Sequence, residues 1–345
     1  MNFIKMRRCE KHFILLFIGS LLLLFSCNNA DLTQYKVIST EAIPLHSATI
    51  LFSRDSNSYF YDLKITEDYL LFLDNSSDTI MQAYGKDNRM KLFSLKGLGD
   101  SILYNPQFSK SDLQITKNSA QIIDNDLYSK ELVLKAGKVL ISSSLLSQNM
   151  INSFDYNITS REIYAVPTNG RCDYQFFCYN TKDDYYWVDA DSILKQKIGN
   201  IPSAYLSHLC VKEQADVVVS AMRFTNSVLF YDLKGKLKQV IKFGENTILP
   251  IKAGDGKSLD ILNTPKCFIG IYGTSKYVYC LYNGTSDFSS SSNILVFNWN
   301  GDHISTLQCN RGLRNIAVNE DNTFLIALSS RTNGGTDVLK FKLER

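Results

Sequence analysis

The chain has 345 residues, of which 45% are hydrophobic and 12% aromatic, enough to bury one large core or two ordinary ones. It contains 37 lysines and arginines and 34 aspartates and glutamates, and four of those basic residues and one acidic residue fall within residues 1–26. The rest of the chain therefore has 33 of each and no net charge. No cluster of basic residues marks the face that a nucleic-acid-binding protein needs.

The amino terminus has the three parts of an export signal. Four of the first 11 residues are basic, residues 13–25 are apolar, and Ser26 is a small residue before Cys27. The apolar run is shorter than the roughly 20 residues that a membrane-spanning helix needs. The pattern is typical of a secretory signal peptide, and we predict that residues 1–26 are removed. A plain signal peptide or a short membrane anchor is the alternative.

The end of this signal resembles the lipobox of bacterial lipoproteins, with the sequence Leu24-Phe25-Ser26-Cys27. We predict that Cys27 is the lipid attachment site, because two or more acyl chains give stable anchoring. Asn28 follows, whereas Asp at this place is the known inner-membrane retention signal, so the cell outer membrane is favoured. The periplasmic and the surface-facing leaflet both remain open. Residues 27–36 would form a lipidated tether and residues 37–345 a single domain.

Beyond the tether, short segments of β-forming residues alternate with polar turns. β-branched and aromatic residues dominate these segments, as is typical of strands on a half-buried pleated surface. No segment keeps a helical apolar period over 12 residues. We therefore predict an all-β domain. Clear examples of the segments are residues 69–74, 138–142, 216–221 and 276–282.

Internal repeats narrow the choice of β fold. Residues 227–241 and 293–307 share one layout, an apolar strand, an Asp or Asn, a Gly turn and a second alternating strand. Weaker copies occupy residues 79–95 and 175–188. An inner strand followed by an outer hairpin is the pattern of propeller blades. The chain length predicts a β-propeller of six blades, with seven as the alternative and a sandwich array as the other interpretation. The expected inner strands are residues 69–74, 120–124, 277–282 and 324–329.

Several segments together resemble the TolB-like six-bladed propeller lipoproteins of gut Gram-negative anaerobes. They are the lipobox, Gly97-Leu98-Gly99, residues 270–286 and the closing residues 294–343. The resemblance covers most of residues 35–345 and is clearest from about residue 205. Asp100-Ser101 departs from the family pattern, in which Pro and an acidic residue often follow the glycines. The resemblance implies a β-propeller and an extracytoplasmic lipoprotein, and it implies no established chemistry.

Motifs for metal or cofactor chemistry are weak. His46, His208 and His303 have no Cys, His or carboxylate at a usual ligand spacing. The acidic pairs near residues 183–191 lack the glycine and closing glutamate of a calcium-binding EF-hand loop. No G-x-S-x-G nucleophile motif is present. We therefore predict no metal and no cofactor.

The function that we predict is a binding module for an envelope protein or a glycan, without catalysis and without nucleic acid, in a monomeric domain. The alternative is a metal-dependent lactone or ester hydrolase of the six-bladed type, with Asp124, Asn226 and Asn283 as axis candidates. An envelope sensor subunit without a small ligand is a third hypothesis. The candidate ligand-facing residues are Arg223, Asn226, Tyr282, Arg311 and Arg314.

Six cysteines follow Cys27 without regular spacing. Such residues are often buried as small hydrophobic side chains. The candidate disulfides join Cys172 to Cys178 and Cys267 to Cys280, provided that their Cβ atoms meet at about 4 Å.

Three Asp-Ser/Thr-Ile tripeptides resemble the O-glycan acceptor pattern of the same group of bacteria. Their candidate acceptors are Thr79, Ser101 and Ser192.

Overall fold

The computed structural model separates residues 1–34 from one compact unit, Tyr35–Arg345. The predicted signal peptide and Cys27 lie outside the described residues. Among the described residues, no helix has the length and apolar character needed to cross a membrane. The structure describes residues 33–45, 48–54, 60–76, 79–86, 91–95, 106–109, 118–123, 128–135, 138–145, 153–160, 162–168, 174–180, 185–201, 203–287, 292–332 and 334–343.

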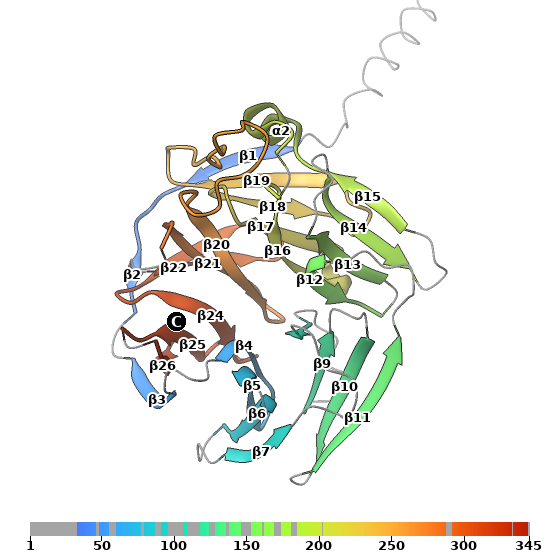
Figure 1. Ribbon diagram of the computed structural model, residues 1–345, viewed down its shortest axis with the longest axis vertical. Helices are drawn as coiled ribbons and strands as arrows, with labels where there is room; N and C mark the ends of the chain where they lie inside the picture. The colour runs from blue at the N-terminus through green and yellow to red at the C-terminus, as the bar shows by residue number, and fades with distance from the viewer. Residues whose placement is uncertain are drawn as a thin grey trace, which may run out of the picture. The chain divides into compact units, whose positions relative to one another are not determined.

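Six antiparallel sheets form the unit that begins at Tyr35, and they stand around a common centre (Figure 1). We number these blades in chain order and name their strands from the centre outwards. Blade 1 has β4 (Phe60–Ile65), β5 (Tyr69–Ser76), β6 (Thr79–Gly85) and β7 (Lys91–Leu95). Blade 2 has β8 (Gln107–Phe108), β9 (Ser119–Ile123), β10 (Tyr128–Lys135) and β11 (Lys138–Leu145). Blade 3 has β12 (Ser153–Ile158), β13 (Glu162–Pro167), β14 (Tyr174–Asn180) and β15 (Tyr185–Asp189).

The second half of the ring has the same plan. Blade 4 has β16 (Ser207–Lys212), β17 (Val217–Met222), β18 (Ser227–Tyr231) and β19 (Leu237–Phe243). Blade 5 has β20 (Lys266–Gly273), β21 (Tyr277–Thr285), β22 (Ser292–Asn298) and β23 (His303–Cys309). Blade 6 has β24 (Leu313–Val318), β25 (Phe324–Ser330) and β26 (Thr336–Lys342). The prediction of an all-β, six-bladed propeller is confirmed.

The start of the domain closes the ring and runs along its outer side. Strand β3 (Thr49–Arg54) pairs antiparallel with β26 and supplies the outer strand of blade 6. Before it, β1 (Gln34–Ile38) adds a fifth strand to blade 4, and β2 (Ile43–Pro44) pairs parallel with β23 in blade 5. Residues 34–36, expected to belong to the tether, therefore form part of a sheet.

Alternating apolar residues hold the blades together. Six buried clusters each combine side chains of two neighbouring blades. In β25, Leu325 and Ala327 pack towards blade 5, whereas Ile326 and Leu328 pack towards blade 1. Successive strand side chains point to opposite faces, and both faces of a blade are covered, so the strands are apolar almost throughout.

The repeated hairpins form the outer halves of four blades, as the repeats predict. Residues 227–241 become β18 and β19, and residues 293–307 become β22 and β23. The turn glycines Gly235 and Gly301 have φ of 80° and 82°, which glycine adopts without steric cost. The expected inner strands, however, are second strands. Residues 69–74, 120–124, 277–282 and 324–329 fall on β5, β9, β21 and β25.

Two short helices interrupt the strands. Helix α2 (Ser192–Ile198) begins where the side chain of Asp191 accepts a hydrogen bond from the Leu194 N–H, and it ends at Gly199. The 3₁₀ helix η1 (Glu213–Ala215) joins β16 to β17.

Candidate functional site

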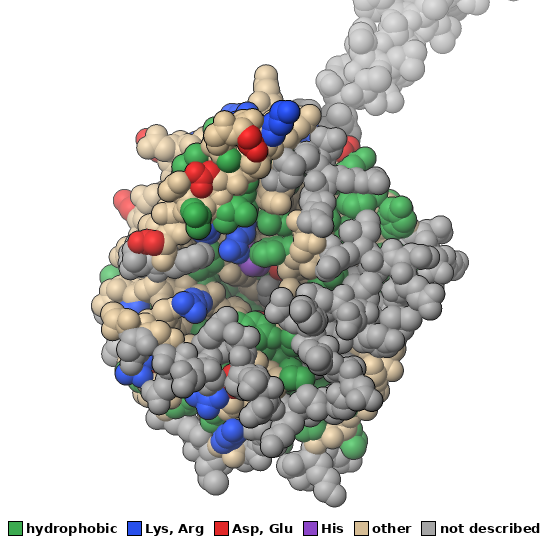
Figure 2. Space-filling view, viewed as in Figure 1, with side chains coloured by type: hydrophobic (Ala, Val, Ile, Leu, Met, Phe, Trp, Pro, Cys, Tyr) green, Lys and Arg blue, Asp and Glu red, His purple; other side chains and the backbone are tan. Residues whose placement is uncertain are grey.

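A cavity of about 400 Å³ opens at the centre of the ring, and all six innermost strands contribute to its lining. A volume of this size lies within the usual range for small-molecule sites, roughly 300–1,000 Å³. Figure 2 shows the hollowed centre, with a histidine and nearby lysine or arginine side chains around it. Ends of two second strands also reach it, through Thr168 after β13 and Arg223 after β17.

Four of the six innermost strands carry a β-bulge at this cavity. In blade 1, Phe60 pairs with Asp74 and Asp62 pairs with Leu73, so Tyr61 is an extra residue without a partner across the ladder. A bulge re-aims the side chain of the extra residue and is common beside functional sites. The corresponding extra residues in blades 3, 5 and 6 are Phe154, Ile269 and Arg314, and all four line the cavity.

The residue after a bulge joins neighbouring blades. Asp62 accepts hydrogen bonds of 2.9 Å from the backbone N–H of Leu63 and of 2.9 Å from that of Phe108 in blade 2. Asn315 Nδ2, from blade 6, donates to Asp62 Oδ1 at 2.9 Å and to the carbonyl oxygen of Tyr61 at 3.2 Å. The buried carboxylate of Asp62 is thus occupied in holding three blades at the axis.

The same arrangement recurs between blades 3 and 4. Asp155 is buried, its Oδ2 lies 3.2 Å from Nδ1 of His208, and it accepts from the Leu209 N–H at 3.3 Å. The ring of Phe154 lies 5.0 Å from the His208 ring, centroid to centroid. His208 is therefore oriented by a carboxylate on one side and an aromatic ring on another.

Arg223 extends over the same aromatic ring. Its guanidinium carbon lies 5.3 Å from the Phe154 ring centroid and 5.7 Å from that of Phe224, both within cation–π range. The guanidinium has no hydrogen-bond acceptor and no carboxylate partner among the described residues. Burial lowers the pKa of Arg223 from its ordinary value, yet an arginine stays charged at neutral pH. The cavity thus contains a half-buried cation that, among the described residues, contacts aromatic faces and no acceptor.

The same ring is found in a solved structure. A member of the DUF4221 family from Bacteroides vulgatus aligns with 88% of this chain and 98% of its own, at a TM-score of 0.60 and 10% identity. That likeness shows a shared fold. Structures described as U3-55K and RRP9 WD40 repeats align at TM-scores of 0.48 and 0.47 and 9% identity, over 86% and 88% of this chain and 98% and 99% of theirs. No family model and no curated protein sequence matches this chain.

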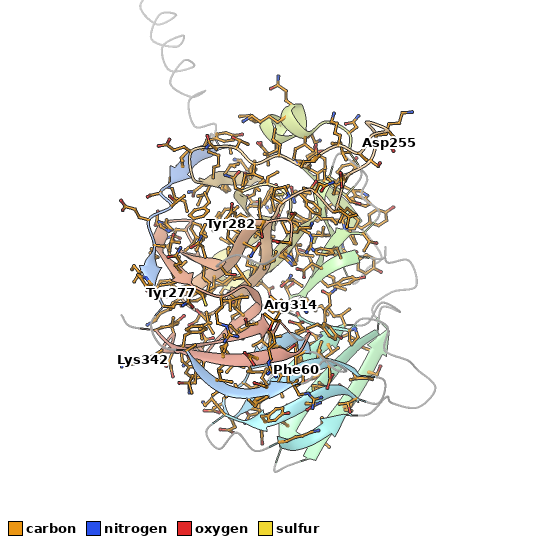
Figure 3. The ribbon with its side chains drawn as sticks, turned by 60° about the vertical axis from the view of Figure 1, so that its left-hand side comes forward. Phe60, Asp255, Tyr277, Tyr282, Arg314 and Lys342 are labelled. Atoms are coloured by element: carbon orange, nitrogen blue, oxygen red, sulfur yellow. The ribbon has the colours of Figure 1, made fainter. Side chains whose placement is uncertain are left out.

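Two of the five predicted ligand-facing residues line the cavity. Arg223 and Arg314 do so, and Figure 3 shows Arg314 towards the middle of the domain. Asn226 instead fixes the loop after β19, since its Nδ2 donates to two backbone carbonyls and its Oδ1 accepts a backbone N–H. Tyr282 is buried within blade 5, and Arg311 pairs with Asp337 at 2.6 Å. These three residues have structural roles outside the cavity.

The residues that sequence reasoning missed are polar or aromatic groups at the starts of the innermost strands. A recurring triplet marks three of them, a large side chain, then Asp or Asn, then an apolar residue. It reads Tyr61-Asp62-Leu63, Phe154-Asp155-Tyr156 and Arg314-Asn315-Ile316. This signal was available in the sequence, but its copies are spaced unevenly because they lie in blades 1, 3 and 6.

A second cavity, of about 590 Å³, lies between blades 3 and 4. Its polar groups largely satisfy one another. The Tyr164 hydroxyl donates to Glu162 at 2.7 Å, the Cys178 thiol lies 3.3 Å from the same carboxylate, and the Tyr186 hydroxyl donates to the carbonyl of Leu233 at 2.7 Å. The axial cavity is therefore the better candidate for a ligand.

The register of blade 5 contradicts one predicted disulfide. Cys280 lies opposite Ile271, four residues along β20 from Cys267, and both cysteines are free and buried. At about 3.3 Å per residue the two thiols are too far apart to bond. Cys178 is also a free buried thiol, and its predicted partner Cys172 lies outside the described residues.

The predicted O-glycan acceptors lie in different settings. Thr79 is half-buried at the start of β6, Ser192 is exposed at the start of α2, and Ser101 lies outside the described residues. Glycosylation at these positions stays a prediction. Among the described residues, no group of three or more His, Cys, Asp or Glu side chains is arranged to hold a metal ion.

Proposed function

We propose that this protein is a binding module whose axial cavity holds a small ligand, most simply the end of a glycan. The observation that carries the proposal is the set of four bulges, because the extra residue of each one lines the same cavity. The described pairs of the two remaining innermost strands, β8 and β16, have no such shift, so closure of the ring does not require a bulge in every blade. Four bulges that place residues around one cavity indicate that the cavity is a binding site.

A glycan suits the cavity better than a folded protein does. The volume of about 400 Å³ fits a ligand of one or two sugar rings, whereas a protein partner needs a broad surface of about 800 Å². Tyr61 offers an aromatic ring against which a sugar ring can pack, and Gln107 offers a hydrogen-bonding amide.

The hydrolase alternative has less support from the same geometry. Asn226 and Asn283, its axis candidates, do not line the cavity, and Asn283 is engaged with the backbone N–H of Thr285 at 3.1 Å. Asp124 lies outside the described residues.

We further propose that the module is anchored by lipid on Cys27 at the outer membrane. The lipobox and the resemblance to TolB-like lipoproteins support this location. A tethered binding domain retains its ligand at the cell envelope, and this is a reason for a binding protein to carry lipid.

A plugged cavity tests the proposal. Gly270 lines the cavity, and a Cβ built there meets its neighbours only at ordinary contact distances. We expect Gly270→Leu to abolish binding of saccharides to the purified protein on a glycan array and by calorimetry. Gly254→Leu is the matched control, because that glycine has open space around it. Absence of saccharide binding in the wild type, or equal binding by both variants, would refute the proposal.

A further inference from the structure

Arg223 is the least compensated charge in the axial cavity. Its long side chain is half-buried, and among the described residues its guanidinium lies over the rings of Phe154 and Phe224 without a hydrogen-bond acceptor. A guanidinium has five N–H donors in a rigid fork, and removing them from water is costly unless acceptors replace the water. An anion in the cavity would supply those acceptors.

The neighbouring charges point in the same direction. The Lys266 ammonium is held by the carbonyl oxygens of Ile261, Leu262 and Ser286, and it lies close enough for Arg223 to lower its pKa, in addition to burial. One further positive group thus lies near Arg223; it does not line the cavity, and the carboxylates of Asp260 and Asp287 act in the opposite direction and raise its pKa.

The carboxylates near the axis are already engaged. Asp62 accepts three hydrogen bonds from blades 1, 2 and 6, and Asp155 is paired with His208. Neither forms an ion pair with Arg223. The lining residues carry two guanidinium groups, from Arg223 and Arg314, against the single carboxylate of Asp62. Neither carboxylate therefore occupies the guanidinium of Arg223.

We propose that the ligand of the axial cavity carries an oxyanion, a carboxylate or a sulfate ester, and that the guanidinium of Arg223 binds it. This inference rests on the proposed function and adds the chemical class of the ligand, an acidic saccharide. The planar fork of arginine matches two oxygens of such a group at once. Stacking against Phe154 orients that fork and leaves its donor edge available for the ligand.

Three matched sugars test which chemical group of the ligand the cavity recognises. Glucose, glucuronate and glucose 6-sulfate share one sugar ring and differ in charge and in the kind of oxyanion. We expect one or both charged probes to bind the purified protein at least about tenfold more tightly than glucose, measured by calorimetry or ligand-observed NMR. Comparison of the two charged probes distinguishes a carboxylate from a sulfate ester.

Substitutions assign the effect to one side chain. Arg223→Gln keeps most of the length and removes the charge, so the ratio of the affinities for the charged probe and for glucose should fall to about one. Arg223→Lys should retain part of the preference. Lys257→Gln is the control, because Lys257 is an exposed cation in the loop that joins blades 4 and 5. It should leave all affinities within about twofold of wild type. Circular dichroism spectra of the variants verify that each is folded.

The outcomes distinguish this inference from the proposed function. In one outcome, glucose binds as tightly as both charged probes, and Gly270→Leu abolishes the binding of all three. In that case the cavity binds saccharides, and the proposal that Arg223 binds an oxyanion is refuted. The same conclusion follows if Arg223→Gln keeps the preference for charge. If none of the three probes binds and no saccharide on the array binds, the proposed function itself fails.

Discussion

The carboxylate of Asp62 gives a sharp test of how the ring is held at its axis. Its side chain is buried and accepts hydrogen bonds from Leu63, Phe108 and Asn315, each at 2.9 Å. In Asp62→Ala, two backbone N–H groups lose their acceptor in a place where water reaches only through the cavity. An unsatisfied buried donor costs about 1–3 kcal/mol, so we expect the variant to lose about 3 kcal/mol of unfolding free energy.

Asp255→Ala is the matched control. Asp255 also accepts three hydrogen bonds, from the Lys257 N–H at 2.8 Å and from the Ser258 N–H and hydroxyl at 2.9 and 2.7 Å. It is exposed, so water replaces the carboxylate when it is removed. We expect a loss below about 1 kcal/mol. Each variant removes three hydrogen bonds that join described residues, and the two positions differ in burial.

Urea unfolding followed by tryptophan fluorescence measures both losses, since Trp187 and Trp299 lie in blades 3 and 5. Asp62→Asn should fall between wild type and Asp62→Ala, because one of the two acceptor oxygens remains. The reasoning is refuted if Asp62→Ala destabilises the protein no more than Asp255→Ala does.

Two further predictions concern a turn and the anchor. A Cβ on Gly235 would overlap the side chain of Val188 in the neighbouring blade, whereas Gly256 has a similar positive φ and open space. Gly256→Ala should lower the free energy of unfolding by about 1 kcal/mol, because alanine is strained at positive φ. Gly235→Ala should lower it by about 2 kcal/mol more, because the added Cβ also overlaps Val188. Equal losses for the two variants in urea unfolding would contradict this contact. Cells fed a labelled fatty acid should label the wild type and leave Cys27→Ser unlabelled, and label on the variant would rule out this attachment site.

Local pattern was enough to predict the class of fold. Segments rich in β-branched and aromatic residues indicated strands, and the repeated hairpins with their glycine turns indicated blades. Both properties depend on residues close together in the chain, since strand propensity and positive φ at Gly235 and Gly301 are local. Arg223 and Arg314 both line the axial cavity, because each follows or begins a strand at the same end of its blade, and their contact with a ligand stays a prediction.

The innermost strands and the bulges were decided by the tertiary structure. An extra residue such as Tyr61 or Phe154 is defined only by the register of the strand beside it, which no local pattern fixes. The same holds for Asp155 and His208, which are 53 residues apart in the chain and meet because blades 3 and 4 are neighbours. The sequence by itself determined that the chain folds into blades. Closure of the ring determined which side chains face the axis, because a site there is assembled from six strands that are distant in sequence.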